Sequence, residues 1–188
     1  MDINKVLEEY DRIEQTHNLE AIEAFLLEKL DEAEGDSGAR FTLLNELIGF
    51  YRETSRFDGM IQACRELLIL MDEMGITGTM PYATGLVNIG NGCRAAGLLG
   101  ESLAYFNAAL NIYNENLDRY DPAFAPLYNN MALLFQEMGD HESACDMHKK
   151  ALELVRDDPN ARIKKAISHT NLALSLLKTD QYDEAIYN

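Results

Sequence analysis

The 188-residue sequence is poor in basic residues and in long apolar runs, and each shortage argues against a class of partner. Lysine and arginine number 16 against 32 acidic residues, and the resulting net charge of −16 repels the phosphate backbone of nucleic acids. No apolar run approaches the ~18 residues of a membrane span. The acidic start MDINKVLEEYDRIEQ also lacks the basic segment and the apolar core of a signal peptide. We therefore expect neither nucleic acid nor a membrane as partner.

Cysteine is scarce as well, with Cys64, Cys93 and Cys145 far apart in the chain. Their number is odd, and each falls on the apolar face of an expected helix. These features indicate buried free thiols rather than a disulfide framework. Free thiols are typical of a reducing compartment, so the sequence predicts a cytoplasmic protein.

Short catalytic motifs are absent from the sequence, which has no phosphate-binding P-loop, no G-x-S-x-G and no H-E-x-x-H. His141, Cys145 and His148 lie at i, i+4 and i+7, a spacing that could present three metal ligands on one helix. They also fall at core places of the repeat described next, and no fourth ligand is evident nearby in the sequence. The sequence therefore predicts no enzyme, no cofactor and no metal.

What the sequence does contain is one pattern that recurs about every 42 residues. In its clearest copy, YNNMALLFQEMGDHESACDMHKKALEL from Tyr128 to Leu154, two amphipathic helices meet at Met138-Gly139-Asp140. The first helix carries large apolar residues around a small one on a single face. In register, these places are Leu44, Leu47, Ile48 and Tyr51; Leu86, Ile89, Gly90 and Cys93; Tyr128, Met131, Ala132 and Phe135; and His169, Leu172, Ala173 and Leu176. A fixed period of this kind marks an array of stacked helix pairs.

The second helix of each pair also places its core residues on one face. Its core places are Ser102, Phe106 and Ala109 in one copy, and Ala144, His148 and Ala151 in the next. The copy that begins near Phe41 departs from the pattern, because Ile48, Met60 and Leu67 stand at the three small places. We expect looser or shifted packing in that copy.

This pattern, large-x2-apolar-small-x2-aromatic followed by A-x3-F and a later alanine, resembles the tetratricopeptide repeat. The longer period is similar to that of kinesin light chain-like repeats. The resemblance covers roughly residues 41–188 and implies an all-α fold, a right-handed α–α superhelix of about five helix pairs. We expect a single domain over residues 1–188, with a diverged N-terminal helix pair at 1–38. Its repeats would start near 41, 83, 125 and 166, the last one incomplete.

The expected helices span residues 2–16, 18–34, 39–54, 57–74, 80–96, 99–119, 123–138, 141–156, 160–178, and a last stretch from about 181. In the first pair we expect ten inward residues: Ile3, Val6, Leu7, Tyr10, Ile13, Ala21, Ile22, Phe25, Leu26 and Leu30. Gly75 and Gly78 should end the fourth helix. Asp121-Pro122 and Asp158-Pro159 each supply a cap and a first-turn proline. Pro126 then requires the helix after Pro122 to begin later or with a distorted turn.

Asparagine recurs at one place of the first helix, directly before the second large apolar residue. Asn88, Asn130 and Asn171 hold this place, with Asn129 and Asn91 close by. Asparagine is a mediocre helix former, and its side chain offers both an acceptor and donors. The resemblance implies that these asparagines line a concave groove and bind the backbone of a peptide. The alternative is that each one bonds a neighbouring helix and fixes the geometry of the repeat.

In the family that the chain resembles, the second, fifth, ninth and twelfth places of each first helix face the groove. Here they are Thr42, Asn45, Gly49 and Arg52; Thr84, Val87, Asn91 and Arg94; Pro126, Asn129, Leu133 and Gln136; and Ile167, Thr170, Leu174 and Leu177. Arg52 and Arg94 would pair with a carboxylate of the ligand. The candidate peptide-binding residues are Asn45, Arg52, Asn88, Asn91, Arg94, Asn129, Asn130, Leu133, Gln136, Thr170 and Asn171.

These observations predict a scaffold that holds a protein or peptide segment in its concave groove. One alternative is a sensor or regulatory domain of a longer protein that binds a small signalling peptide. Because the last repeat ends too early to cover its own face, we expect either that the natural chain continues past Asn188 or that another molecule covers this end. The second case would be a homodimer that pairs through its uncovered terminal helices. Residues 1–75 hold 18 acids and 7 bases, which make either a solubilising surface or a face for a basic partner.

Overall fold

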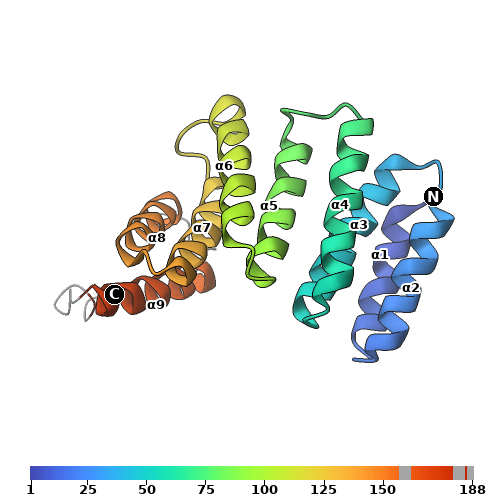
Figure 1. Cartoon of the computed structure of the whole chain (residues 1–188), viewed down its shortest axis with the longest axis horizontal. Coiled ribbons are helices and arrows are strands. Elements are labelled where there is room, and N and C mark those ends of the chain that lie inside the picture. The colour runs from blue at the N-terminus through green and yellow to red at the C-terminus, as the bar shows by residue number, and fades with distance from the viewer. Residues whose placement is uncertain (157–161, 180–184, 186–188) are drawn as a thin grey trace. The chain divides into compact units, whose positions relative to one another are not determined.

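The structure is a computed structural model that describes residues 1–156, 162–179 and 185 (Figure 1). Within these residues every regular element is a helix, and no strand is present. The helices are α1 (Ile3–Glu14), α2 (Leu19–Glu32), α3 (Ser37–Glu53), α4 (Phe57–Glu73), α5 (Met80–Ala95), α6 (Leu99–Asn116), α7 (Phe124–Met138), α8 (His141–Val155) and α9 (Arg162–Lys178).

All described helix ends but one fall within two residues of the expected positions, and the exception is the end of α6. α6 ends at Asn116 and not at 119, because Leu117 takes an extended backbone with φ −121° and ψ 154°. α7 begins at Phe124, which places Pro126 third in the helix, where a backbone N–H would have no helical partner. Asp158-Pro159 and most of the stretch expected from 181 lie outside the described residues.

Side-chain caps and glycines explain where several helices start and stop. The Asp140 carboxylate accepts the backbone N–H of Ser143 at 3.1 Å at the start of α8. Just before it, Gly139 closes α7 in the left-handed region with φ +81°. Gly75 and Gly78 likewise have positive φ after α4, as the sequence predicts. The ends of these helices are therefore determined largely by residues close to them in the sequence.

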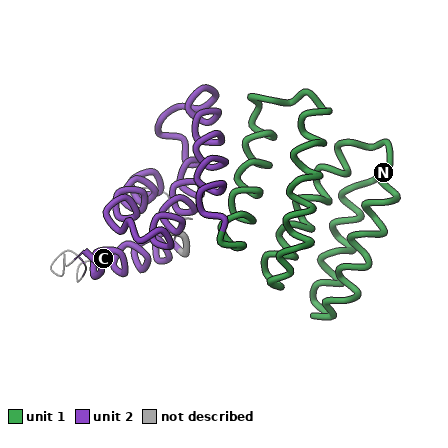
Figure 2. Tube along the Cα trace, viewed as in Figure 1, with its two compact units in different colours: residues 1–97 green, residues 98–188 purple. Residues whose placement is uncertain are grey.

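The chain divides into two compact units, residues 1–97 and residues 98–188 (Figure 2). In the first unit, α1 packs on α2, α2 on α3, and α3 on both α4 and α5. In the second unit, α6 packs on α7, α7 on α8, and α8 on α9. Within each unit, each helix thus lies against its neighbours in sequence, as stacked repeats require. The single domain over residues 1–188 stays a prediction.

The core confirms the repeat pattern most clearly in the second helices. All six predicted places are fully buried at 0% exposure: Ser102, Phe106, Ala109, Ala144, His148 and Ala151. The first-helix places are buried too, except that Tyr128, Phe135, His169 and Ala173 are half-buried. The period therefore identifies the buried face correctly.

The divergent copy of the repeat is shifted in its packing but is not loose. Ile48, Met60 and Leu67 are at most 1% exposed, although they occupy places that are small in other copies. A Cβ added at Gly92 of α5 would lie 3.0 Å from the Cys64 sulfur and 3.5 Å from Met60. The missing side chain at Gly92 thus makes room for the larger residues of α4.

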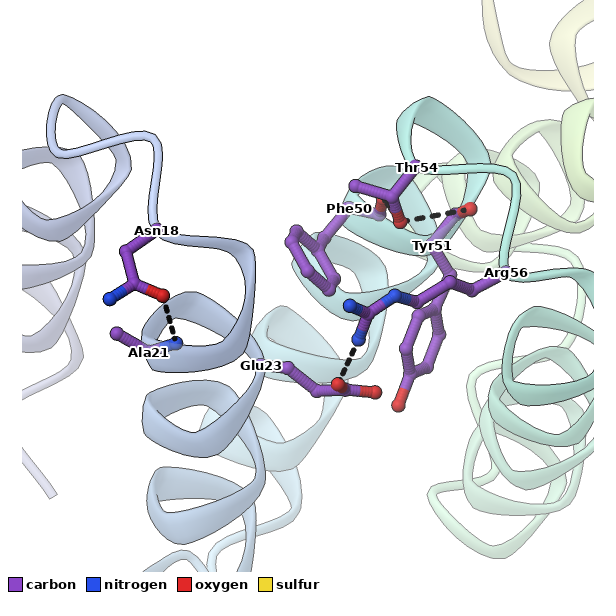
Figure 3. Close-up of polar contacts among 7 residues, drawn as sticks. All are labelled: Asn18, Ala21, Glu23, Phe50, Tyr51, Thr54 and Arg56. Atoms are coloured by element: carbon purple, nitrogen blue, oxygen red, sulfur yellow. Dashed lines mark hydrogen bonds and ion pairs between the residues drawn. The ribbon is translucent and has the colours of Figure 1, made fainter.

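In the N-terminal helix pair, one of the ten residues expected to point inward does not. Ala21 is exposed, because it lies in the first turn of α2, where its N–H bonds the Asn18 cap at 3.1 Å (Figure 3). The other nine are buried or half-buried. All three cysteines are buried free thiols, and burial raises the pKa of Cys64 to about 12.

An ion pair attaches this N-terminal pair to the first repeat. Figure 3 shows the Arg56 guanidinium directed at the Glu23 carboxylate of α2, with the rings of Phe50 and Tyr51 beside it. The guanidinium carbon lies 5.6 Å from the centre of the Phe50 ring, within cation–π range. Burial, together with a hydrogen bond that Tyr51 donates to Glu23, raises the pKa of Tyr51 to about 12. One arginine before α4 thus ties α2 to α3.

His148 belongs to the core of the second unit. Its side chain is fully buried, and its Nδ1 lies 3.1 Å from Oδ1 of Asn129. Because the amide oxygen only accepts, Nδ1 carries the proton. Burial lowers the pKa of His148 to about 4, so the ring is neutral at pH 7. Within the described residues, no three His, Cys, Asp or Glu side chains are grouped to hold a metal ion.

Gly85→Ala should destabilise the protein, because the added Cβ would lie 2.3 Å from the sulfur of the fully buried Met71. We expect a loss of about 1–2 kcal/mol after the gain in helix propensity is subtracted. Gly49→Ala is the matched control, since nothing lies within 4 Å of its Cβ, and it should stabilise α3 by up to about 1 kcal/mol. Urea unfolding measures both, and equal effects would refute the close contact.

Because His148 is buried as a neutral ring, the protein should be less stable in mild acid than at pH 7. Between pH ~6.5 and pH ~4 the unfolded chain binds more protons at this residue than the folded chain does. The free energy of unfolding should therefore fall by up to about 3 kcal/mol as the pH drops through that window. His148→Gln keeps a donor for Asn129 and cannot titrate there, so denaturant titrations should show a shallower pH dependence. Identical pH profiles for both proteins would contradict a buried neutral ring.

Candidate functional site

The predicted peptide-binding residues lie on the first helices of the repeats, and they form one set in each unit. In the first unit α3 and α5 carry Asn45, Arg52, Asn88, Asn91 and Arg94. In the second unit α7 and α9 carry Asn129, Asn130, Leu133, Gln136, Thr170 and Asn171.

Two asparagine amides link α3 to α5 in the first unit. Asn88 Nδ2 donates to Asn45 Oδ1 at 2.7 Å, and Asn45 Nδ2 donates to the Phe41 carbonyl at 2.7 Å. The Asn45 side chain is therefore engaged at both ends within the protein. Asn88 keeps its own oxygen and a second N–H. Asn45 fixes the spacing of the two helices, and Asn88 retains polar groups for a ligand.

The other predicted residues of the first unit differ in their accessibility. Arg52 and Arg94 are half-buried, and Arg52 lies 3.7 Å from the carboxylate of its neighbour Glu53. Asn91 is only 6% exposed, so it presents little surface. This set therefore offers two arginines and one amide, rather than a continuous column of asparagines.

Glu46 was not predicted as a site residue, although it occupies the recurring asparagine place of its repeat in the first unit. The signal was present, because Glu46 precedes Asn88 by 42 residues. The side chain is half-buried, and burial, with smaller contributions from Glu14 and Asp11, raises its pKa. Carboxylates from α1 and α3 thus lie close together, and they make this end of the candidate site acidic.

In the second unit, Asn129 joins three helices through a single oxygen. Its Oδ1 accepts from Nδ1 of His148 on α8 and from the Ser168 hydroxyl on α9, each at 3.1 Å. Asn129 itself lies on α7. These bonds use the oxygen completely and leave the amide N–H groups as donors. The side-chain oxygen of Asn129 therefore agrees with the alternative prediction, in which an asparagine bonds neighbouring helices and fixes the geometry of the repeat.

Gln136 makes a second link between α7 and α9. Its Nε2 donates to the Ser175 hydroxyl at 2.6 Å and to the Asn171 carbonyl at 3.3 Å. The side-chain amides of Asn130 and Asn171 are half-buried and have no hydrogen-bond partner among the described residues. These two asparagines therefore retain both donors and an acceptor.

A small apolar pocket lies beside Asn129. It measures about 190 Å³ and is lined by Pro122, Ala125, Pro126, Asn129, Val155, Ile167 and Ser168. Three of these residues were predicted to face the groove from sequence alone: Pro126, Asn129 and Ile167. The pocket combines apolar walls with the amide of Asn129, which can donate to a bound carbonyl.

The outer face of α9 is the most accessible part of the predicted surface. Its four predicted places, Ile167, Thr170, Leu174 and Leu177, are all exposed. On α7 the corresponding residues beyond Pro126 are half-buried, and α9 bonds two of them. Leu133, between those two, is also half-buried. None of the helices in the described ranges combines the length and the apolarity that crossing a bilayer requires.

Comparison with known proteins places these helices in a family. The profile of the tetratricopeptide repeat matches residues 81–157 and 123–188, which together make up more than half of the chain. No curated protein matches the chain in sequence. Its identity therefore rests on the repeat profile and on the fold.

Several solved structures have folds similar to this chain. BtubC (BKLC) from P. vanneervenii has a TM-score of 0.86 at 17% identity, over 98% of this chain and 76% of that chain. The nearly identical TPR-like repeats of a putative kinesin light chain from Podosopora anserina reach 0.79 at 13% identity, over 100% and 93%. MamA reaches 0.63 at 13% identity, over 95% and 88%.

At these identities the structural likenesses show the fold alone, and they confirm the expected all-α superhelix of stacked helix pairs. The match to the repeat profile shows the family. The chain belongs to the tetratricopeptide repeat family.

Proposed function

We propose that this protein is a scaffold that holds an extended peptide segment of a partner on the first-helix faces of its repeats. Proteins built from tetratricopeptide repeats generally bind other proteins and are generally not enzymes. Stacked helices present a preformed surface, so the ordering cost of binding falls mainly on the ligand. The observation that carries the proposal is the exposed apolar face of α9 next to the Asn129 pocket.

Three large apolar side chains on α9 are unusually accessible. Ile167, Leu174 and Leu177 are 54%, 55% and 47% exposed, and they lie at i, i+7 and i+10 on one face of the helix. A row of exposed apolar residues favours contact with another protein. It supports a binding surface at places that the repeat register assigns to the groove.

The size of the adjacent pocket indicates what part of a ligand it would hold. At about 190 Å³ it is smaller than the ~300–1,000 Å³ of small-molecule sites. It is therefore suited to a single apolar side chain of a peptide. The N–H groups of Asn129 would then donate to a neighbouring peptide carbonyl, and Asn130 and Asn171 offer further polar groups along the backbone.

The set in the first unit, taken by itself, would bind a peptide through different groups. Asn88 retains an acceptor and a donor for the peptide backbone. Burial, with the nearby carboxylates of Glu14 and Asp11, raises the pKa of Glu46, so a basic side chain there would relieve the repulsion. Arg52 and Arg94 are the candidates to pair with an acidic group. This part of the site thus favours a segment that carries charge of both signs.

Substitutions of Asn129 and Asn130 should distinguish a structural role from a binding role. Asn129→Ala leaves the buried His148 Nδ1–H and the Ser168 hydroxyl without their acceptor, so it should cost about 2–3 kcal/mol of unfolding free energy. Asn130→Ala should change the stability by no more than about 0.5 kcal/mol. Thermal and denaturant unfolding of both variants measure the difference. Equal stabilities would show that the three-helix bond is unimportant.

Peptides selected from a displayed random library on the wild-type protein supply ligands for the second test. Leu174→Glu and Asn130→Ala should each weaken the selected peptides by about tenfold or more, because they introduce a charge or remove a backbone contact. Ile69→Glu is the control, since Ile69 is 59% exposed but lies on the second helix α4, away from the predicted places. Fluorescence anisotropy measures the affinities. If Ile69→Glu weakens binding as much as Leu174→Glu does, the proposed site is wrong.

A further inference from the structure

A groove in the first unit lies where the turn between α1 and α2 meets the end of α3. It measures about 420 Å³, is here called the corner groove, and takes its walls from all three helices. Its floor is apolar, because Ile22 and Phe50 line it and are only 3% and 6% exposed. Figure 3 shows the Phe50 ring on the side of α3 that faces the start of α2, where Asn18 and Ala21 lie.

The rim of the corner groove carries two carboxylates, and no lysine or arginine lines it. Glu14 is the last residue of α1 and Glu53 is the last residue of α3, and both are exposed. Within the described part of the chain, Glu14 forms no ion pair, and Glu53 forms one, at 3.7 Å with its neighbour Arg52. The Glu53 side chain is still 68% exposed in that pair. Both carboxylates are therefore accessible to a ligand.

Further carboxylates lie along the contact between α1 and α3. Burial raises the pKa of Tyr10 to about 12, and four carboxylates add to the shift: Glu14, Glu46, Glu53 and Asp11. All four therefore lie close to one hydroxyl, and their charges repel one another. A cation bound at the rim would reduce this repulsion, so the negative charge favours a basic ligand.

The helix ends around the corner groove have the same electrostatic preference. α1 and α3 both end there, and the C-terminal end of a helix carries a partial negative charge. α2 begins there with the opposite polarity, but its first turn contains Glu20. Arg56 lies 5.6 Å from the centre of the Phe50 ring, and its charge is balanced by Glu23. The groove thus combines an apolar floor with a negative rim.

A long basic side chain matches this combination, because its stem is apolar and its charge lies at the tip. Arginine suits two carboxylates on different helices better than lysine does. Its planar guanidinium has five N–H donors and can bond both carboxylates at once, whereas an ammonium is a compact point charge. The groove is more than twice the size of the Asn129 pocket, so it has room for peptide backbone beside the side chain.

We propose that the corner groove binds an arginine side chain of a partner protein. The stem of the arginine covers Ile22 and Phe50, and its guanidinium lies between Glu14 of α1 and Glu53 of α3. The corner groove shares no residue with the Asn129 pocket or with the predicted peptide-binding residues of the first repeats. This site therefore goes beyond the proposed function and can be tested separately from it.

Blocked peptides that differ in one side chain test the proposal on the full chain. Each has glycine and alanine around a central arginine, lysine or citrulline, and citrulline has the shape of arginine without its charge. The arginine peptide should bind about fivefold or more tightly than the citrulline peptide, with the lysine peptide between them, because exposed ion pairs contribute modestly. Titrations followed by ¹H–¹⁵N NMR spectra of the protein measure the affinities. The shifted amides should cluster at residues 14–22 and 50–54.

Neutral substitutions locate the site. Glu14→Gln with Glu53→Gln should weaken the arginine peptide by about fivefold or more. The control is Glu8→Gln with Glu73→Gln, which removes the same charge from exposed places on α1 and α4 outside the groove and should weaken the peptide by less than about twofold. Thermal unfolding checks each variant, and exposed substitutions of this kind should leave the fold intact.

Five outcomes would overturn the proposal. Equal weakening by both double variants would mean that only the overall charge matters. Equal binding of the arginine and citrulline peptides, or of neither, would exclude a cation site. Tighter binding of the lysine peptide would refute the preference for arginine. Full competition by about 5 mM magnesium chloride at constant ionic strength would identify a site for divalent cations. Weakening by Leu174→Glu would place the arginine peptide on the α9 face, whereas an unchanged affinity in that variant would support a separate site.

Discussion

The second unit depends on a single amide oxygen. Asn129 Oδ1 accepts one bond from α8 and one from α9, and it lies on α7, so three helices meet at one acceptor. A buried donor that loses its acceptor is costly, so each of these helices is held in register by the same atom. The arrangement also fixes the tautomer of His148 and the direction in which the Asn129 N–H groups point. Architecture and the candidate site thus share one side chain.

In the first unit, α4 and α5 can approach closely because a large side chain on one helix lies opposite a glycine on the other. Met60 is large where other repeats are small, and Gly92 on α5 supplies space for it. Dense packing requires only that the total volume fits, so a large residue on one helix can be matched by a glycine on the next. This explains how a repeat can depart from its consensus without leaving a void.

The sequence predicts the fold well because the period of the core residues is a direct consequence of helix geometry. Ser102, Phe106 and His148 were placed in the core from spacing alone, and all are fully buried. The burial of an individual residue was harder to predict where it depends on more than the spacing within one helix. Ala21 was expected to be buried by its helical spacing, but its position in the first turn of α2 turns it to solvent.

The candidate site could be predicted only in outline. The register assigned Asn129, Asn130 and Ile167 to one face, but it could not show that Asn129 is bonded internally while Asn130 is not. Hydrogen bonds between residues about 20 to 40 positions apart depend on the stacking of the helices, which spacing within one helix does not determine.

The contact between Met71 and Gly85 also has a chemical consequence. Oxidation of methionine adds an oxygen to the sulfur and makes the side chain polar. The Met71 sulfur lies 2.3 Å from the place that a Cβ of Gly85 would take, and Met71 is fully buried, so an added oxygen has little room while α4 and α5 are packed. Met138, which is 45% exposed, has no such protection. The fold therefore sorts its methionines into oxidisable and protected ones, and Met71 becomes reactive only when the first unit opens locally.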